Sequence, residues 1–222
     1  MRTRLFILGT IAAMLLSCGQ KADKNSSNPD ATAKEIAQEI ADTKSYYIEY
    51  KTTMDMQGMK STSVSKQWID IKNDRLVMET ETENEMMGQK TKESALTIGK
   101  DGYTYVISLT NKTGLKMKSD GNEEDPMDNI KPDDNETFRQ MIEKEGGKII
   151  GNEDFLGKNC IVIEMTSEGT TMKMWYYKGI PLKMTSDAYV MEAVKFEEGI
   201  SIPDSKLEIP EDITISEMPV MN

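Results

Sequence analysis

The sequence predicts a mainly β protein with a few helices, an α+β fold built on an antiparallel sheet. Residues 46–57 alternate apolar and polar side chains with a period of two, which is typical of a strand with one solvated face. Short segments rich in Gly, Asn and Asp separate this run from later apolar runs, as hairpin turns do. Only two segments show the residue spacing of an amphipathic helix.

The first expected element is a helix over residues 31–44, for which Asp30 suits the N-cap position. Its apolar stripe consists of Ala33, Ile36, Ala37, Ile40 and Ala41. In the strand that follows, one face carries Tyr46, Ile48, Tyr50, Thr52, Met54 and Met56. Further strands are expected over residues 64–72, 76–82, 94–98, 103–110 and 115–118.

An acidic segment at residues 119–136 then interrupts the strands, with eight carboxylates in eighteen positions. As an EF-hand starting at Asp120 it has Asp125 and Lys131 where calcium loops need Gly and Glu, so a solvated loop is favoured over a calcium site. A second helix is expected over residues 137–145, with Gly146-Gly147 ending it. Strands are expected again over residues 148–150, 159–167, 170–178, 182–186 and 191–197.

Composition excludes several functions. The 222 residues contain no histidine, so a Ser-His-Asp triad, a Cys-His dyad and the usual zinc sites cannot be built. The net charge of -11 argues against nucleic acid as a partner. Carboxylates are plentiful, but no spacing singles out an acid and a base. We therefore expect no catalysis, no cofactor and no metal bound by the usual ligands.

The N-terminus has the pattern of a secretory signal. Arg2 and Arg4 precede an apolar run over residues 5–16, which is shorter than the ~20 residues of a membrane-spanning helix. The following Leu-Leu-Ser-Cys-Gly resembles a bacterial lipobox. The resemblance implies that residues 1–17 are removed and that Cys18 carries a lipid anchor; an incidental thiol beside an ordinary cleavage site is the alternative.

We expect the anchored Cys18 to begin a flexible tether over residues 18–30, followed by a single domain over residues 31–222. Cys160 is then the remaining cysteine, so an intramolecular disulfide is not expected. Gly19 takes the place where many inner-membrane lipoproteins carry Asp, and this resemblance favours the outer membrane of a bacterium. The domain would face the periplasm or the cell surface.

Three C-terminal segments carry a family resemblance. They are Phe-Leu-Gly-Lys-Asn-Cys-Ile-Val at residues 155–162, Met-Trp-Tyr-Tyr-Lys-Gly-Ile-Pro-Leu-Lys at 174–183, and Ile-Pro-Asp-Ser-Lys-Leu-Glu-Ile-Pro-Glu-Asp at 202–212. Over residues 45–215 the chain resembles uncharacterised bacterial envelope lipoproteins of the LolA/LolB-like superfamily, which includes outer-membrane lipoprotein carriers. The resemblance implies a single curved antiparallel sheet, an unclosed half-barrel, with helices on its concave side. Family members with known roles carry lipids or lipoproteins there.

The leading hypothesis is therefore a lipid-anchored, non-catalytic protein that holds an acyl chain, a lipid or a lipoprotein-like apolar ligand in this concavity. Methionine and aromatic side chains suit adaptable apolar surfaces. The candidate ligand-binding residues are Tyr50, Met54, Met56, Trp68, Tyr105, Met172 and Met174.

The methionines leave two alternatives open. Met54, Met56 and Met59 lie in one short segment, and Met172 and Met174 share a strand face with Tyr176. Thioethers are soft ligands for Cu(I), so a copper-binding protein is one alternative. The same side chains also fill irregular cores, which makes a structural envelope lipoprotein without a ligand the other.

Overall fold

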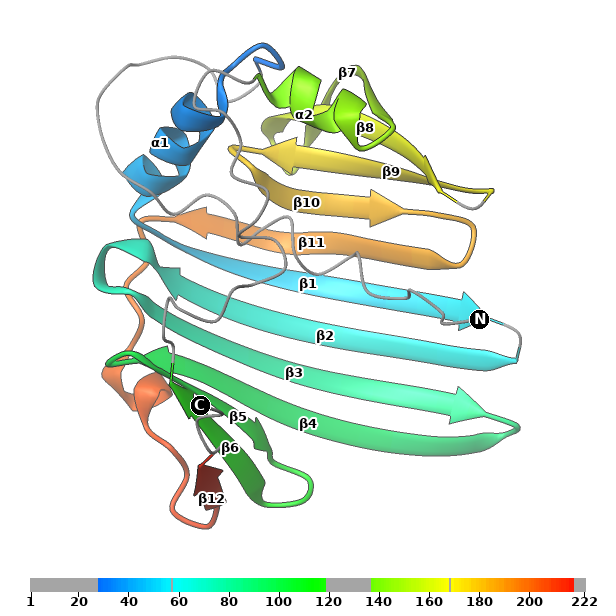
Figure 1. The fold of residues 1–222 in the computed structure, drawn as a ribbon. Coiled ribbons are helices and arrows are strands. Elements are labelled where there is room, and N and C mark those ends of the chain that lie inside the picture. The colour runs from blue at the N-terminus through cyan, green and yellow to red at the C-terminus, as the bar shows by residue number, and fades with distance from the viewer. Residues whose placement is uncertain (1–27, 57, 119–136, 168, 218–222) are drawn as a thin grey trace, which may run out of the picture. The chain divides into compact units, whose positions relative to one another are not determined.

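Strands dominate the computed structural model, which describes residues 28–56, 58–118, 137–167 and 169–217. Twelve strands form one sheet in the order β12-β6-β5-β4-β3-β2-β1-β11-β10-β9-β8-β7. The α-helices of the described residues are α1 and α2 (Figure 1). β12 and β7 are the two edges of this order, so the described strands form an open sheet.

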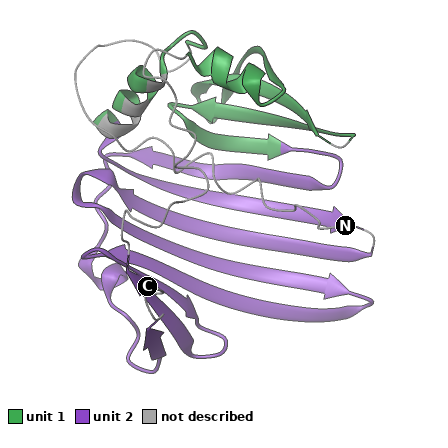
Figure 2. Cartoon of the chain, in the orientation of Figure 1, with its two compact units in different colours: residues 1–42, 122–184 green, residues 43–121, 185–222 purple. Residues whose placement is uncertain are grey.

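The chain divides into two compact units (Figure 2). Unit 1 contains residues 1–42 and 122–184, and unit 2 contains residues 43–121 and 185–222. Each unit is therefore built from two separate stretches of chain. Both α-helices and the strands from β7 to β10 belong to unit 1, apart from Thr43 at the end of α1 and Thr185 at the end of β10.

Unit 2 is a meander completed by the C-terminal strands. Its strands are β1 (Ser45–Met56), β2 (Met59–Asp70), β3 (Arg75–Met86), β4 (Gln89–Lys100), β5 (Tyr103–Ser108), β6 (Thr113–Lys118), β11 (Tyr189–Glu198) and β12 (Thr214–Glu217). Two 3-10 helices, η2 (Ile71–Asn73) and η3 (Asp204–Leu207), lie between strands. β11 pairs antiparallel with β1, and β12 pairs parallel with β6.

Two-residue turns set the register of the long hairpins. Met87 and Gly88 both have positive φ, at 52° and 78°, which is the turn geometry that matches the twist of the flanking strands. The same pattern recurs at Asp101-Gly102, Leu156-Gly157 and Lys178-Gly179. Glycine adopts this left-handed conformation without steric cost, so it takes the second place in each turn.

Unit 1 packs two helices on one face of its strands. The elements are α1 (Ala33–Thr43), α2 (Phe138–Lys144), β7 (Gly147–Phe155), β8 (Lys158–Ser167), β9 (Thr170–Tyr177) and β10 (Ile180–Thr185). Thr137 caps α2 in a reciprocal capping box with Gln140, which satisfies free donors of the first turn. Ile36 of α1 and Phe138 of α2 are buried, and the ring of Phe138 lies edge-on to that of Tyr176 at 6.0 Å.

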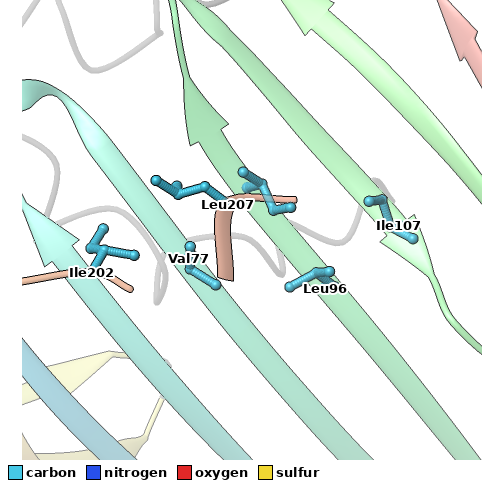
Figure 3. Packing of buried hydrophobic residues seen from close by; sticks show 6 residues of the cluster. Val77, Leu96, Ile107, Ile202 and Leu207 are labelled. Atoms are coloured by element: carbon cyan, nitrogen blue, oxygen red, sulfur yellow. The ribbon is translucent and has the colours of Figure 1, made fainter. Parts of the chain in front are cut away.

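The core of unit 2 lies on one face of β3, β4 and β5, beneath the C-terminal segment. Its buried members are Val77, Leu96, Ile98, Ile107, Ile202 and Leu207. Figure 3 shows Ile202 and Leu207 on the same side as the strand residues that they cover. Unit 2 thus buries apolar side chains from both of its chain stretches.

The predicted fold class is confirmed: the protein is mainly β, has few helices and forms one open sheet. Several details differ from the prediction. α1 begins at Ala33, and the hydroxyl of Thr32, not the side chain of Asp30, accepts from the N–H of Glu35 at its start. β7 spans Gly147–Phe155, whereas the predicted strand covered residues 148–150.

β2, β3 and β4 are twelve residues each. They are longer than the apolar runs that predicted them, because the strands remain paired through stretches made mostly of polar residues. β12 was not predicted, and it adds one parallel pair to an otherwise antiparallel sheet. The predicted signal, Cys18 and the acidic segment 119–136 lie outside the described residues.

Candidate functional site

Strand β1 places Tyr50, Met54 and Met56 on one face of unit 2, because alternate residues of a strand point to the same side. Tyr50 lies opposite Ser65 of β2 and Ala193 of β11. Residues directly opposite one another in an antiparallel pair share a face. The three predicted residues therefore belong to a surface that extends across β11, β1, β2 and β3.

We call this surface the uncharged face. It consists of Tyr189, Met191, Ala193 and Phe196 of β11; Ile48, Tyr50, Thr52, Met54 and Met56 of β1; Met59, Ser61, Ser63, Ser65 and Gln67 of β2; and Met78, Thr80, Thr82, Asn84 and Met86 of β3. None of these side chains is charged, although 29% of the residues in the chain are. Charge returns at its margins with Glu93, opposite Thr82, and Glu198, opposite Tyr46.

The opposite face of the same strands is strongly charged. Its ionic side chains include Lys51, Asp55, Lys60, Lys66, Glu81, Glu83 and Glu85. Cross-strand ion pairs join Lys60 to Asp55 at 3.5 Å and Lys90 to Glu85 at 3.6 Å, and Lys92 pairs with Glu83. These pairs are exposed and stabilise the sheet little. The contrast between the faces follows from the period of two in the sequence.

Exposure differs between the faces in the same way. Along β2, Ser61, Ser63 and Ser65 are half-buried, whereas the alternating Lys60 and Thr62 are exposed. The serine column Ser61, Ser63 and Ser65 is thus more sheltered than the residues that alternate with it. Serine side chains are small, so they cover less of the sheet surface than larger residues would.

The uncharged face is most buried at the end where β1 begins. Ile48 is fully buried, and Tyr50 and Ala193 are 7% and 2% exposed. At this margin burial raises the pKa of Tyr46 to about 12, and its ring lies 5.8 Å from that of Phe196. Further along, burial raises the pKa of Tyr189, which a hydrogen bond with Thr52 opposes. From the start of β1 to its end, the uncharged face is therefore first buried and aromatic, then lined by hydroxyl groups, and finally lined by methionines.

Trp68 and Tyr105 lie on the other face of unit 2. Trp68 is opposite Val77, Tyr105 is opposite Ile98, and both pack against the core cluster beneath the C-terminal segment. The structure therefore does not bring them together with Tyr50, Met54 and Met56. Their surroundings are those of a filled core, which satisfies the apolar area of both rings.

Met172 and Met174 belong to unit 1. Met174 is 2% exposed and lies opposite Ile163, and the hydroxyl of Tyr176 donates to its sulfur at 3.6 Å. A cavity of about 10 Å³ between α1, α2 and this sheet face is lined partly by Phe138, Ile161 and Tyr176. That volume corresponds to about one water molecule. Met174 is part of the packed core by its own burial, and Met172 on the same strand face is half-buried.

Sequence reasoning missed the residues that complete the uncharged face. Ser61, Ser63, Ser65, Thr80 and Thr82 are not apolar, so they do not stand out as ligand contacts. The signal that finds them is their uniform lack of charge at alternate positions of β2 and β3; in β3 the residues between them are all glutamates.

Two further observations bear on chemistry. Among the described residues, no group of three or more His, Cys, Asp or Glu side chains is arranged to hold a metal ion. In the same part of the chain, every helix is too short or too polar to cross a membrane.

Comparison with known proteins shows that the fold of the open sheet occurs in a solved structure. No family model and no curated protein matches the chain. An uncharacterized conserved protein from Thermus thermophilus aligns with a TM-score of 0.51 and 9% identity, over 84% of this chain and 99% of that chain. At this identity the similarity concerns the fold alone.

Weaker similarities extend to two other bacterial proteins. LprF from Mycobacterium bovis has a TM-score of 0.38 and 8% identity, over 77% of this chain and 95% of that chain. A DUF1329 family protein from Desulfovibrio piger ATCC 29098 has a TM-score of 0.33 and 10% identity, over 79% and 95%. At these scores the similarity supports no functional argument.

Proposed function

We propose that the protein is a non-catalytic binding protein of the bacterial cell envelope, and that it holds a long acyl chain on the uncharged face of unit 2. One observation carries this proposal: a sheltered surface four strands wide without a charged side chain, in a chain with 29% charged residues. A charged group next to an acyl chain loses hydration without gaining a partner. A surface for apolar chains must therefore be free of charge.

The dimensions of the face suit such a ligand. On this face of β1 only Thr52, Met54 and Met56 are not buried, and from Thr52 to Met56 the strand extends for about 13 Å at its usual rise per residue. One acyl chain spans about half of the ~30 Å hydrocarbon core of a bilayer, so the strip has room for most of one chain. Each methylene that it shelters contributes about 0.8 kcal/mol. Met54 and Met56 would contact the chain, and the buried Tyr50 would close the strip at its inner end. The hydroxyls of Ser61, Ser63 and Ser65 would exchange hydrogen bonds with a polar headgroup.

The proposed location rests on the sequence. The lipobox-like segment supports acylation of Cys18 and a signal over residues 1–17, and two or three acyl chains make membrane attachment effectively permanent. Gly19 favours the outer membrane. The tether over residues 18–30 would hold the folded part away from the lipid surface, facing the periplasm or the exterior, where it would receive a lipid or the acyl chains of a lipoprotein.

Binding is tested with an uncharged fatty-acyl probe whose fluorescence reports on polarity, added to the chain carrying Cys18→Ser. We expect saturable binding at micromolar concentration. Ser63→Glu places one carboxylate in the middle of the uncharged face and should weaken binding at least about tenfold, since an unpaired charge near an apolar ligand costs more than about 1.4 kcal/mol. The uncharged probe excludes simple charge repulsion as the cause.

Thr53→Glu is the matched control. Thr53 lies on the adjacent strand and on the opposite face, between Thr62 and Val190, and it is exposed. This change should leave probe binding unaltered. Absence of saturable binding by the unsubstituted chain, or equal weakening by both substitutions, contradicts the proposal. Native mass spectrometry of protein extracted from membranes then tests the anchor, which Cys18→Ser should remove.

A further inference from the structure

Three methionines from three strands form a row at the far end of the uncharged face. Met56, the last residue of β1, lies opposite Met59, the first residue of β2. Met59 in turn lies opposite Met86, the last residue of β3. All three side chains therefore share one face. We call them the methionine row.

Core packing does not account for the methionine row. Met56 and Met86 are 44% and 58% exposed, and Met59 is half-buried. Methionine is ordinarily useful in proteins as a filler of irregular apolar space, but these thioethers lie at a solvent-exposed strand end. Their exposure leaves the three sulfur atoms accessible to a ligand from solution.

The charged residues at this end face away from the row. Asp55 pairs with Lys60, and Glu85 with Lys90, on the opposite face of the two hairpins. The next positions on the row's own face are Met54, Ser61 and Asn84, all uncharged. The surroundings therefore offer soft sulfur donors without a carboxylate, which suits a soft monovalent cation and disfavours a hard divalent one.

We propose that the methionine row binds one Cu(I) ion through the sulfur atoms of Met56, Met59 and Met86. Adjacent strands are about 4.8 Å apart, so an ion above Met59 has the other two methionines one strand away on each side. Each methionine has three rotatable side-chain bonds, which allow the outer sulfurs to turn toward the centre. The site needs both hairpins, because Met56 and Met59 come from one and Met86 from the other.

Ion binding is tested by methyl NMR of the chain carrying Cys18→Ser, labelled at the methionine methyl groups. Ag(I) serves as a redox-stable probe for Cu(I), and Cu(I) is then titrated anaerobically against a chromogenic chelator. We expect saturation at one ion per chain, with the largest shifts at the methyl groups of Met56, Met59 and Met86. Zn(II) should leave all three unmoved.

Single leucine substitutions test the donor set, because leucine keeps the volume and removes the sulfur at little cost in stability. Met59→Leu should weaken Cu(I) binding at least about tenfold, since even the loss of an outer-shell partner costs that much at metal sites. Met87→Leu is the control: Met87 is 94% exposed but belongs to the turn, outside the row. The proposal is overturned if stoichiometric Ag(I) shifts the signals of other methionine methyl groups instead. It is also overturned if Met59→Leu and Met87→Leu weaken Cu(I) binding equally. Probe binding in Ser63→Glu is independent of either result.

Discussion

Lys206 of η3 lies over the indole ring of Trp68, with Nζ 4.4 Å from the ring centroid. The same ammonium is 2.5 Å from Oε1 of Glu79, so one side chain of the C-terminal segment contacts both β2 and β3. Both partners of the ion pair are about one-third exposed, and such pairs contribute at most about 1 kcal/mol. Lys206 therefore fixes the position of the segment, while the adjacent buried Leu207 supplies most of its stability.

Replacing Leu207 with alanine should destabilise unit 2 by about 2–5 kcal/mol, the usual cost of emptying a buried leucine site. The measurement is urea denaturation in a Trp175→Phe background, where Trp68 alone reports on unit 2. Leu109→Ala is the control, because Leu109 is 37% exposed and should change stability by less than about 1 kcal/mol. Equal effects of the two substitutions would show that the segment does not close the core.

Asp70 links the stability of unit 2 to pH. Burial alone would raise its pKa, but hydrogen bonds from Asn73 and Arg75 together outweigh burial and hold the pKa below its ordinary value. Its carboxylate accepts from the Arg75 guanidinium at 2.9 Å and from the Asn73 side chain at 2.7 Å. Because the folded pKa is depressed, this stabilisation is present above the unfolded value of about 3.9 and is lost as pH falls through the folded value.

Asp70→Asn should therefore cost about 1–3 kcal/mol at neutral pH, as expected for hydrogen bonds to a charged group. The difference in the free energy of unfolding between wild type and Asp70→Asn should become smaller as pH falls below about 4, where the native carboxyl also becomes neutral. Denaturation midpoints across this range provide the measurement. Asp74→Asn is the control, since Asp74 is exposed and has a φ of 50° that asparagine tolerates. A difference in unfolding free energy that does not change with pH would contradict the link between Asp70 ionisation and stability.

The fold was predictable where local pattern and tertiary pairing agree. Alternation over residues 46–57 located β1 to within a residue at each end, and Gly-containing turns separated most hairpins. The turn at Met87-Gly88 was missed because an apolar residue occupies a position usually taken by Asn or Asp. β12 was missed because four residues with one half-buried position have no readable period, and its pairing with β6 is set by the distant contact of Ile215 with the core.

The candidate site was predictable only within one strand. Alternation placed Tyr50, Met54 and Met56 on a common face, because the period of two is a local property. Cross-strand register, in contrast, depends on which strands become neighbours, and a single sequence does not state that. The addition of Met86 and the serine column therefore required the structure. For the same reason, Trp68 could not be separated from Tyr50 by inspection of residue types alone.

Cys160 should be chemically inert in the folded protein. It is fully buried, and burial raises its pKa to about 11, whereas the thiolate is the reactive form. In the chain carrying Cys18→Ser, a disulfide reagent at about pH 8 should modify Cys160 only at the rate of unfolding, because at that pH the thiolate fraction is small. Denaturant should restore rapid reaction. Met87→Cys, at an exposed position, should react at once; a folded Cys160 that reacts as fast would contradict its burial.

Gly147 allows α2 to approach β7, and this closeness predicts the effect of adding a methyl group. A Cβ at Gly147 would lie 2.8 Å from Cγ2 of Ile142 and 2.9 Å from Cγ of Met165, closer than carbon atoms pack. Gly147→Ala should therefore push α2 away and destabilise unit 1 by about 1–3 kcal/mol. Urea denaturation in a Trp68→Phe background follows the change, because Trp175 then reports on unit 1.

The cause of the Gly147→Ala effect is separable from the general properties of glycine. Gly99→Ala makes the same change in β4, where a Cβ would meet Leu76 Cβ at 3.4 Å, an ordinary contact that should cost little in unit 2. Leucine has no methyl group at the position of Cγ2, so Ile142→Leu should recover part of the stability lost in Gly147→Ala. The losses of stability from substitutions at independent sites add, whereas those at contacting sites do not. If the double variant loses the sum of the two single losses, with no recovery, a clash with Ile142 is not the cause of the Gly147→Ala effect.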